Sequence, residues 1–203
     1  TIAILGALYH RTQTGEGQHI DIALLDVQVS WLANQAQNYF CSGKPPVRTG
    51  DYHPNLVPYQ PFPTADGQQI IIAIGNNGQF QRWCETIGLG ELAQDVRFAT
   101  NAERVKHRVE LIKLLVNVTK TRTLKQWTVL LNEIGVPCGP IQDIAQVFDD
   151  PQVQARGMQV TLDSAHGPVK GVANPIKYSK TTLEYHKAPP ARGEETDDVR
   201  ESV

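Results

Sequence analysis

One local pattern constrains the fold of this chain more than any other. An apolar run from Ile70 to Ile74 is β-branched at four of five positions, which is typical of a buried strand. Thr64-Ala65-Asp66-Gly67 precedes it, and Asp-Gly between two strands is a strong hairpin signal. One helical face then follows, formed by Phe80, Trp83, Cys84 and Ile87. The sequence therefore predicts a hairpin that leads directly into a helix.

Polar, turn-forming residues lie on both sides of this hairpin. The stretch from Gly50 to Tyr59 carries several side chains that could contact a ligand, and the second strand ends in Gly75-Asn76-Asn77-Gly78. A strand, a Gly/Asn loop and a helix N-terminus often hold an anion or a carbonyl group. The candidate binding residues are therefore Gly50, His53, Asn55, Tyr59, Gly75 and Asn76. The alternative is ordinary turn chemistry, in which Pro54, Pro58 and Pro61 make the stretch a rigid linker.

Composition excludes several classes of protein. The 203 residues are 40% hydrophobic and 20% charged, which is ordinary for a globular protein. A net charge of −2 gives no basis for binding nucleic acid or an anionic membrane. No apolar stretch approaches the roughly 20 residues of a membrane span, and no signal-peptide pattern is visible. Cys41, Cys84 and Cys138 are odd in number and lack CxxC spacing, which favours buried thiols in a reducing compartment over disulfides or zinc.

The residues before the hairpin predict a helix over 1–10, a two-glycine turn at 12–18 and an alternating strand from His19 to Leu25. We expect Asp21 to lie on a solvated strand edge and Asp26 to cap a helix that runs to Phe40. The linker from Ser42 to Pro46 ends this part of the chain.

Two helices are predicted after the residues already described. Asn101 is expected to cap the first, with an apolar face of Val105, Val109, Ile112 and Val116. Its solvent face is expected to carry Arg104, His107, Arg108 and Lys113. Thr123 is expected to cap the second helix, which ends at Gly135. Its inward-facing side chains are expected to be Leu124, Trp127, Leu131 and Ile134. Residues 60–135 thus predict a small α+β unit with three helices, and short strands are expected at 158–162 and 169–173.

Four motifs together resemble the family III CoA transferases, which include the formyl-CoA, carnitine and dicarboxylate CoA transferases and are related to α-methylacyl-CoA racemase. The first is R-x-x-T-G-x-G-Q, which ends at Gln18. The second combines residues 53–60, 64–67 and 75–80. The third is the G-V-P-x-G-P loop around 136–141, which makes a structural thiol of Cys138 more plausible than a nucleophile. The fourth is the closing G-x-H-T-x-x-V at 193–199, where Glu195 replaces the histidine.

The resemblance implies an α/β fold with a Rossmann-like large domain, built from both chain ends, and a small α+β domain inserted between them. Residues 1–47 would be a segment of the large domain with a linker helix. Residues 48–155 would be the small domain with its substrate-covering loop, and residues 156–203 would return to the large domain. It also implies an interlocked homodimer, located in the cytoplasm or, in a eukaryote, in the mitochondrial matrix.

The activity implied is transfer of CoA from an acyl-CoA to a free carboxylic acid through an enzyme-aspartyl intermediate. CoA thioester is then a substrate, and no metal or other cofactor is expected. The family's nucleophile lies in a D-x-x-T-G motif, which these residues lack, and Met158 is the only methionine. We therefore expect a C-terminal portion that is inactive alone and has its nucleophile upstream of Thr1. The Gly50–Tyr59 stretch would match the family's mobile, often glycine-rich loop, and the six candidate residues would bind substrate or CoA.

Two alternatives remain open. Racemases of the group tend to carry G-A-x-E-P-x-F where this chain has Gly75 to Phe80, and the missing acidic residue favours the transferase. A non-catalytic binding or assembly module is the second alternative, because the nucleophile motif is absent. The amides of Gln60 and Asn77 are compatible with a dicarboxylate acceptor without identifying one.

Overall fold

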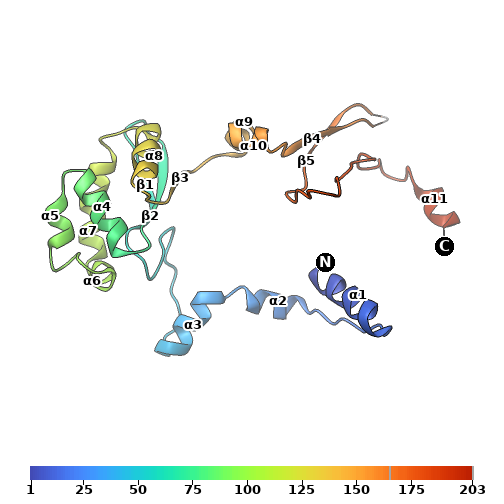
Figure 1. Ribbon diagram of the computed structural model, residues 1–203, viewed down its shortest axis with the longest axis horizontal. Helices are drawn as coiled ribbons and strands as arrows, with labels where there is room; N and C mark the ends of the chain where they lie inside the picture. Colours follow the sequence, from blue (N-terminus) through green and yellow to red (C-terminus); the bar gives the residue numbers. More distant parts are fainter. Residues whose placement is uncertain (165, 203) are drawn as a thin grey trace. The chain divides into compact units, whose positions relative to one another are not determined.

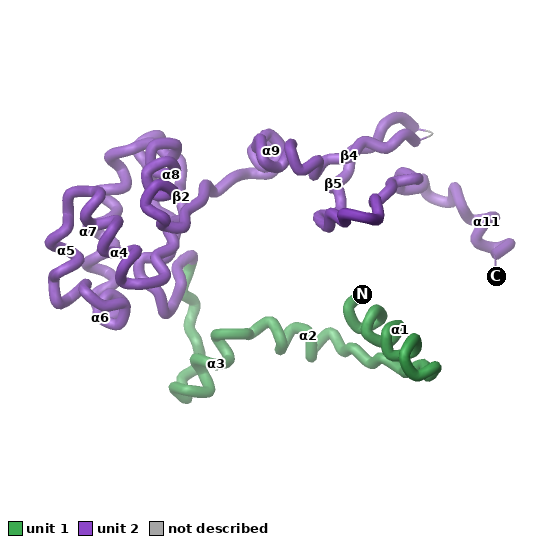
Figure 2. The backbone as a smooth tube through the Cα atoms, viewed as in Figure 1, with its two compact units in different colours: residues 1–50 green, residues 51–203 purple. Residues whose placement is uncertain are grey.

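The computed structural model describes residues 1–164 and 166–202 as a mixed α/β chain (Figure 1). It divides into two compact units, residues 1–50 and residues 51–203 (Figure 2). Among the described residues, no helix combines the length and the apolar character needed to cross a bilayer. The first unit contains the helices α1 (Ile2–Thr14), α2 (Leu24–Ser30) and α3 (Ala33–Ser42).

The first unit departs from the sequence prediction in two places. The strand expected from His19 to Leu25 is wrong, because residues 16–23 have no regular structure and Leu24 begins α2. Strand backbone needs a partner for its N–H and C=O groups, and no described segment pairs with these residues. Asp26 lies in the first turn of α2, whereas the N-cap is Ala23. Its negative charge therefore lies in the first turn, near the positive end of the helix dipole, and the helix has no side-chain cap.

The helix expected from Asp26 to Phe40 is interrupted. α2 ends at Ser30, and α3 begins at Ala33, whose φ of 41° is unusual for a residue with a Cβ. No residue of α1, α2 or α3 is buried, and Trp31 is 77% exposed. The apolar faces of these helices are thus left uncovered by the described chain.

The predicted hairpin in the second unit is confirmed. β1 (Tyr59–Pro63) pairs antiparallel with β2 (Gln69–Ala73), and Gly67 has the positive φ of 74° that such a tight turn requires. The Asp66 carboxylate accepts hydrogen bonds from Thr64 Oγ1 at 2.5 Å and from the Leu124 amide at 3.2 Å. These hydrogen bonds lower the pKa of Asp66. The bond from Leu124 also attaches the turn to the helix that begins at that residue.

A third strand was not predicted. β3 (Cys138–Pro140) pairs antiparallel with the other edge of β2, with Ile71 opposite Gly139, so that the sheet has the order β1-β2-β3. The sequence prediction placed these residues in a loop. Three residues that end in proline carry no alternating pattern, and the free edge of β2 is what makes them a strand.

Five helices accompany the sheet where three were expected. They are α4 (Asn77–Thr86), α5 (Gly90–Gln94), α6 (Asn101–Lys106), α7 (Arg108–Thr119) and α8 (Leu124–Glu133). We call these helices with β1–β3 the core module, residues 59–140. Its buried side chains include Ile70 and Ile72 on one face of β2 and Ile74 directly after the strand. They pack with aromatic rings such as Trp83 and Trp127, whose centroids lie 6.4 Å apart at 75°.

The apolar face predicted for the helix after residue 100 is partly wrong. Thr100 rather than Asn101 is the N-cap, and the helix breaks at His107, where φ is −100° and ψ is 21°. Arg104, expected in solvent, is fully buried, whereas Val109 is 85% exposed. The break rotates the second helix relative to the first, so one continuous periodicity does not describe both.

The prediction for α8 is confirmed. Thr123 and Gln126 form a reciprocal capping box at its start. Trp127 and Leu131 are fully buried, and Gly135 has the φ of 67° typical of a helix C-terminus. The local capping signals therefore place both ends of this helix correctly.

The remaining elements follow the core module in the chain. They are α9 (Ile144–Asp149), α10 (Pro151–Ala155), β4 (Gln159–Leu162), β5 (Val169–Val172) and α11 (Thr196–Glu201). β4 and β5 form an antiparallel pair, which confirms the two short strands expected here. Glu195, the residue in place of the family's histidine, lies just before α11 and pairs with Lys187.

Candidate functional site

Several predicted residues meet at the open end of the β1–β2 hairpin. β1 begins at Tyr59, opposite Ala73 at the end of β2, and the Ile74 amide donates to the Pro58 carbonyl at 2.9 Å. We call residues 51–58 the His53 loop. It turns back onto the strand, because the His53 amide donates to the Tyr59 carbonyl at 2.9 Å. The structure thus brings the His53 loop, the start of β1 and the residues after β2 together, whereas Gly50 belongs to the other unit.

The His53 ring is held in a defined orientation. It stacks on the Tyr59 ring with centroids 5.2 Å apart and planes inclined by 17°. Its Nδ1 accepts a hydrogen bond from the Asn55 amide at 3.1 Å. An imidazole nitrogen that accepts carries no proton, so the proton of neutral His53 resides on Nε2. His53 is partly exposed and therefore presents one N–H donor.

Gly75 and Asn76 have clear local roles at the start of α4. The Gly75 amide donates to Gln79 Oε1 at 2.7 Å, and the Gln79 amide donates to Asn76 Oδ1 at 2.9 Å. Asn76 is therefore the N-cap of α4. Sequence reasoning did not single out Gln79. Its side-chain oxygen accepts the hydrogen bond of the Gly75 amide, which is therefore not available to a ligand carbonyl.

Three side chains from α6 and α7 form hydrogen bonds with the backbone of the His53 loop. Arg108 Nη2 donates to the carbonyls of His53 and Pro54 at 2.8 and 2.9 Å. Arg104 Nε donates to the Val57 carbonyl at 2.6 Å. Asn101 accepts from the Val57 amide at 3.1 Å and donates to the Asn55 carbonyl at 2.7 Å. These contacts join the candidate loop to the core module.

Sequence reasoning assigned both arginines to the solvent face, although a signal for the inward position of Arg108 is present. Leu111 and Leu115 are buried, and Arg108 precedes Leu111 by three residues within α7. Residues at this spacing share one helical face, so an apolar face extended backwards would have predicted that Arg108 lies toward the core. Arg104 lies in α6, before the break at His107, and this periodicity does not extend to it.

The two guanidinium groups that bind the His53 loop carry positive charge. Arg104 also donates to the Phe98 carbonyl at 2.9 Å and to Asn77 Oδ1 at 3.1 Å, and its guanidinium lies 4.5 Å from the Phe80 ring centre. Burial lowers the pKa of Arg104 to about 10 and also lowers the pKa of Arg108. Both remain charged at pH 7. Neither forms an ion pair with a carboxylate in the described part of the chain.

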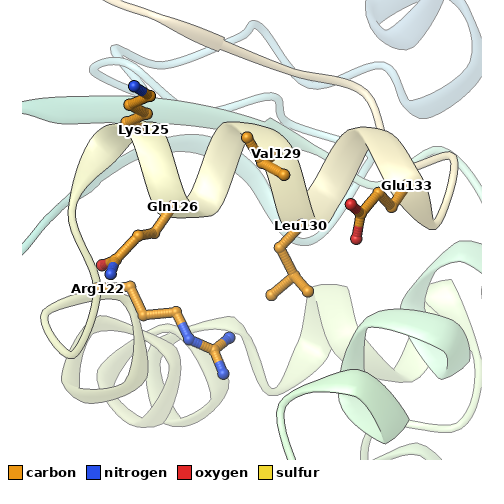
Figure 3. A pocket seen from close by; sticks show the side chains of 6 residues that line it. All are labelled: Arg122, Lys125, Gln126, Val129, Leu130 and Glu133. Carbon is orange, nitrogen blue, oxygen red and sulfur yellow. The ribbon is translucent and has the colours of Figure 1, made fainter.

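A separate hollow of about 450 Å³ lies along α8 (Figure 3). It is lined by Arg122, Lys125, Gln126, Val129, Leu130 and Glu133, and none of the candidate residues contributes to it. The Arg122 guanidinium lies 5.0 Å from the ring centre of Trp127. This hollow is therefore distinct from the hairpin end that carries the His53 loop.

Cys84 is buried and Cys138 is partly buried, and neither gives a sign of nucleophilic activation, whereas Cys41, also expected to be a buried thiol, is exposed. Burial raises the pKa of Cys84 to about 12 and raises the pKa of Cys138 as well. A reactive cysteine needs a lowered pKa, so both thiols stay protonated at neutral pH. Residues 1–164 and 166–202 contain no cluster of three or more His, Cys, Asp or Glu side chains that could hold a metal ion.

The chain belongs to CoA-transferase family III, whose model matches residues 1–196. It is 48% identical over 193 residues to the succinate–glutarate CoA-transferase of Agrobacterium fabrum, covering 95% of this chain and 48% of that protein. It is 36% identical over 204 residues to human succinyl-CoA:glutarate CoA-transferase, covering 99% of this chain and 46% of that protein. The chain thus spans about half the length of these relatives.

Solved structures agree with this assignment. A CAIB/BAIF family protein from Brucella suis shares 46% identity and a TM-score of 0.75, covering 99% of this chain and 52% of that one. A Mycobacterium tuberculosis protein shares 26% identity and a TM-score of 0.79, covering 96% of this chain and 51% of that one. The predicted family membership is confirmed.

Proposed function

We propose that the full-length protein transfers CoA from an acyl-CoA to a free carboxylic acid. The observation that carries this proposal is the 48% identity with a succinate–glutarate CoA-transferase over 95% of the chain. The human relative is also named for a succinyl donor and glutarate. We therefore propose a dicarboxylate as the acceptor. Asn77, a candidate for binding it, already uses its Oδ1 to accept from Arg104 and from the Asn101 amide, which favours a structural role for that side chain.

The reaction is proposed to pass through an enzyme-aspartyl intermediate. No D-x-x-T-G motif occurs in the 203 residues. Asp66 accepts hydrogen bonds from Thr64 and Leu124, which serve the hairpin turn, so it is engaged structurally. We place the nucleophile in a part of the full-length protein outside these residues.

The His53 loop is proposed to form a wall of the site next to the reacting acyl group. Charge develops on a carbonyl oxygen in each transfer step, and fixed N–H donors stabilise it. His53 Nε2–H is such a donor, held in place by the stacked Tyr59 ring and the Asn55 amide. Gly50, which precedes the loop, and Gly75 and Asn76, which follow β2, remain proposed binding residues.

The remaining architecture is also a proposal. The full-length protein would have a Rossmann-like large domain, to which residues 1–47 and 156–203 contribute, and would form an interlocked homodimer. The uncovered apolar side chains of α1, α2 and α3 support further protein segments as partners, because helices of this kind are stabilised mainly by packing.

Trapping the intermediate tests the transfer reaction. With an acyl-CoA donor, the full-length protein should form a covalent enzyme–CoA species that hydroxylamine cleaves and borohydride reduces, detected as mass changes on one aspartate. Exchange of CoA between succinate and glutarate should be lost when that aspartate is replaced by asparagine. Racemisation of a 2-methylacyl-CoA without any exchange of CoA would contradict the proposal in favour of a racemase.

His53→Ala should lower the turnover number of the full-length enzyme by about 100-fold, because one donor to the developing oxyanion is lost. The Michaelis constant for the acyl-CoA should change much less, since the donor acts mainly in the transition state. His53→Gln keeps an N–H donor and should recover part of the rate. His107→Ala, at the junction of α6 and α7, is the control. Unchanged turnover in both His53→Ala and Asn55→Ala would return the loop to a linker role.

Residues 1–203 alone should catalyse no CoA transfer, because the proposed nucleophile is supplied from elsewhere. Addition of a separately produced N-terminal portion that contains the D-x-x-T-G aspartate should restore activity. Steady-state assays of the chain alone, of the mixture and of a mixture with the aspartate replaced by asparagine measure this. Robust transfer by residues 1–203 alone would show that the nucleophile lies within them.

A further inference from the structure

The backbone of the His53 loop is bonded to side chains along most of its length. Its carbonyls at His53, Pro54, Asn55 and Val57 all accept hydrogen bonds from side chains of α6 and α7. Its amides at His53, Asn55 and Val57 all donate within the same unit. A loop whose backbone groups are satisfied by a packed scaffold has little freedom to swing.

Arg108 occupies the centre of this arrangement. One nitrogen, Nη2, bridges two successive carbonyls, and the guanidinium lies 4.3 Å from the centre of the Tyr52 ring. The planar, charged guanidinium suits such a fixed, multi-donor contact better than a flexible ammonium would. Arg104 and Asn101 hold the end of the loop at Val57.

We propose that Arg108, assisted by Arg104 and Asn101, is a positioning residue that fixes the His53 loop against the core module. The loop is then a permanent wall of the site and not the swinging lid that a glycine-rich loop would provide. His53 and Asn55 stand where the glycines would be, and the Nδ1 bond between them requires a fixed backbone. The inference rests on the proposed CoA transfer for its kinetic readout only.

The competing role for Arg108 is direct contact with substrate. Its Nη1 is buried and has no hydrogen-bond partner among the described residues. A substrate contact and a loop anchor both predict a slower enzyme, so activity alone cannot separate them. The rate of hydrogen exchange in the loop separates them, because only an anchor changes it in the absence of substrate.

The test uses the full-length protein with Arg108→Met, Arg108→Lys and the control Arg97→Met. Arg97 is an arginine of the same core module that pairs with Asp95 and Glu110, outside the loop. Arg108→Met should raise the exchange of the His53 and Asn55 amides about tenfold or more, with a smaller rise at Val57, which Asn101 holds. It should lower the turnover number about 10- to 100-fold, because misplacement by about 1 Å has that effect. Arg97→Met should change neither quantity.

Arg108→Lys keeps the charge but not the two-carbonyl bridge, so it should restore only part of the rate and leave loop exchange raised. Full recovery in Arg108→Lys would overturn the anchoring role in favour of charge alone. A slower Arg108→Met enzyme with unchanged loop exchange would overturn it in favour of substrate contact. If Arg108→Met does not fold, Arg108→Lys gives the same readouts. Raised exchange in a protein that transfers no CoA would refute the proposed reaction but not the anchor.

Discussion

Trp127→Ala should reduce the free energy of unfolding of the core module by about 3–5 kcal/mol. The indole is fully buried and packs edge-to-face on Trp83. Its Nε1 donates to the buried Thr119 carbonyl at 2.7 Å, so truncation leaves a cavity and also removes that carbonyl's donor. Hydrogen exchange of the β2 and α8 amides in the full-length protein measures the change, because these amides exchange through opening of the module.

Two further variants separate the causes of this loss. Trp127→Phe keeps an aromatic ring but has no N–H donor, so it should lose a smaller part of the stability, largely from the Thr119 carbonyl. Val129 lies on the same helix and is 52% exposed, so Val129→Ala should change stability by about 0.5 kcal/mol or less. Equal effects of Trp127→Ala and Val129→Ala would contradict the core position assigned to the indole.

Arg104→Met should reduce the same free energy by about 3–5 kcal/mol, even though methionine fills a similar space. The guanidinium serves three acceptors, the carbonyls of Val57 and Phe98 and the side-chain oxygen of Asn77. The carbonyls of the fully buried Val57 and Phe98 lose their charged donor in the variant, whereas the Asn77 oxygen keeps the Asn101 amide as a donor. Exchange of the β2 amides reports the loss of stability, and exchange of the Val57 amide reports release of the loop.

The matched control for this variant is Lys106→Met on the same helix. Its side chain is 66% exposed and pairs with Glu103. Exposed pairs of this kind contribute little, so stability should change by about 0.5 kcal/mol or less. A stable, tightly folded Arg104→Met protein would mean that the three acceptors find other donors and that the buried charge is dispensable.

The parts of the fold that the sequence predicted correctly have local causes. Asp66-Gly67 specifies the hairpin turn, Asn76 caps α4, and Thr123 with Gln126 caps α8. Each signal depends on residues within one turn of one another. The strand expected from His19 to Leu25 failed because pairing is decided by a partner segment, and alternation alone cannot supply one.

The candidate site was predictable in outline only. The position of His53 and Gly75 on either side of the hairpin follows from its register, which the turn determines. The hydrogen bonds from arginine side chains to the His53 loop could not be predicted from the sequence, because a charged side chain on a helix ordinarily faces solvent. The burial of Arg104 makes sense only once the Val57 carbonyl is seen to point at it, and that carbonyl is 47 residues away in the sequence.

The late third strand has a consequence for biosynthesis. Ile70 in β2 pairs with Pro140 in β3, about 70 residues later, whereas its other neighbour, Phe62, precedes it closely. At roughly 5–20 residues per second, one edge of an isoleucine-rich strand waits about 4–14 s on the ribosome before its partner has been translated. An unpaired apolar edge readily recruits other chains. Folding of the core module during translation should therefore depend most on chaperones after residue 74 has emerged from the ribosome and before residue 140 has emerged.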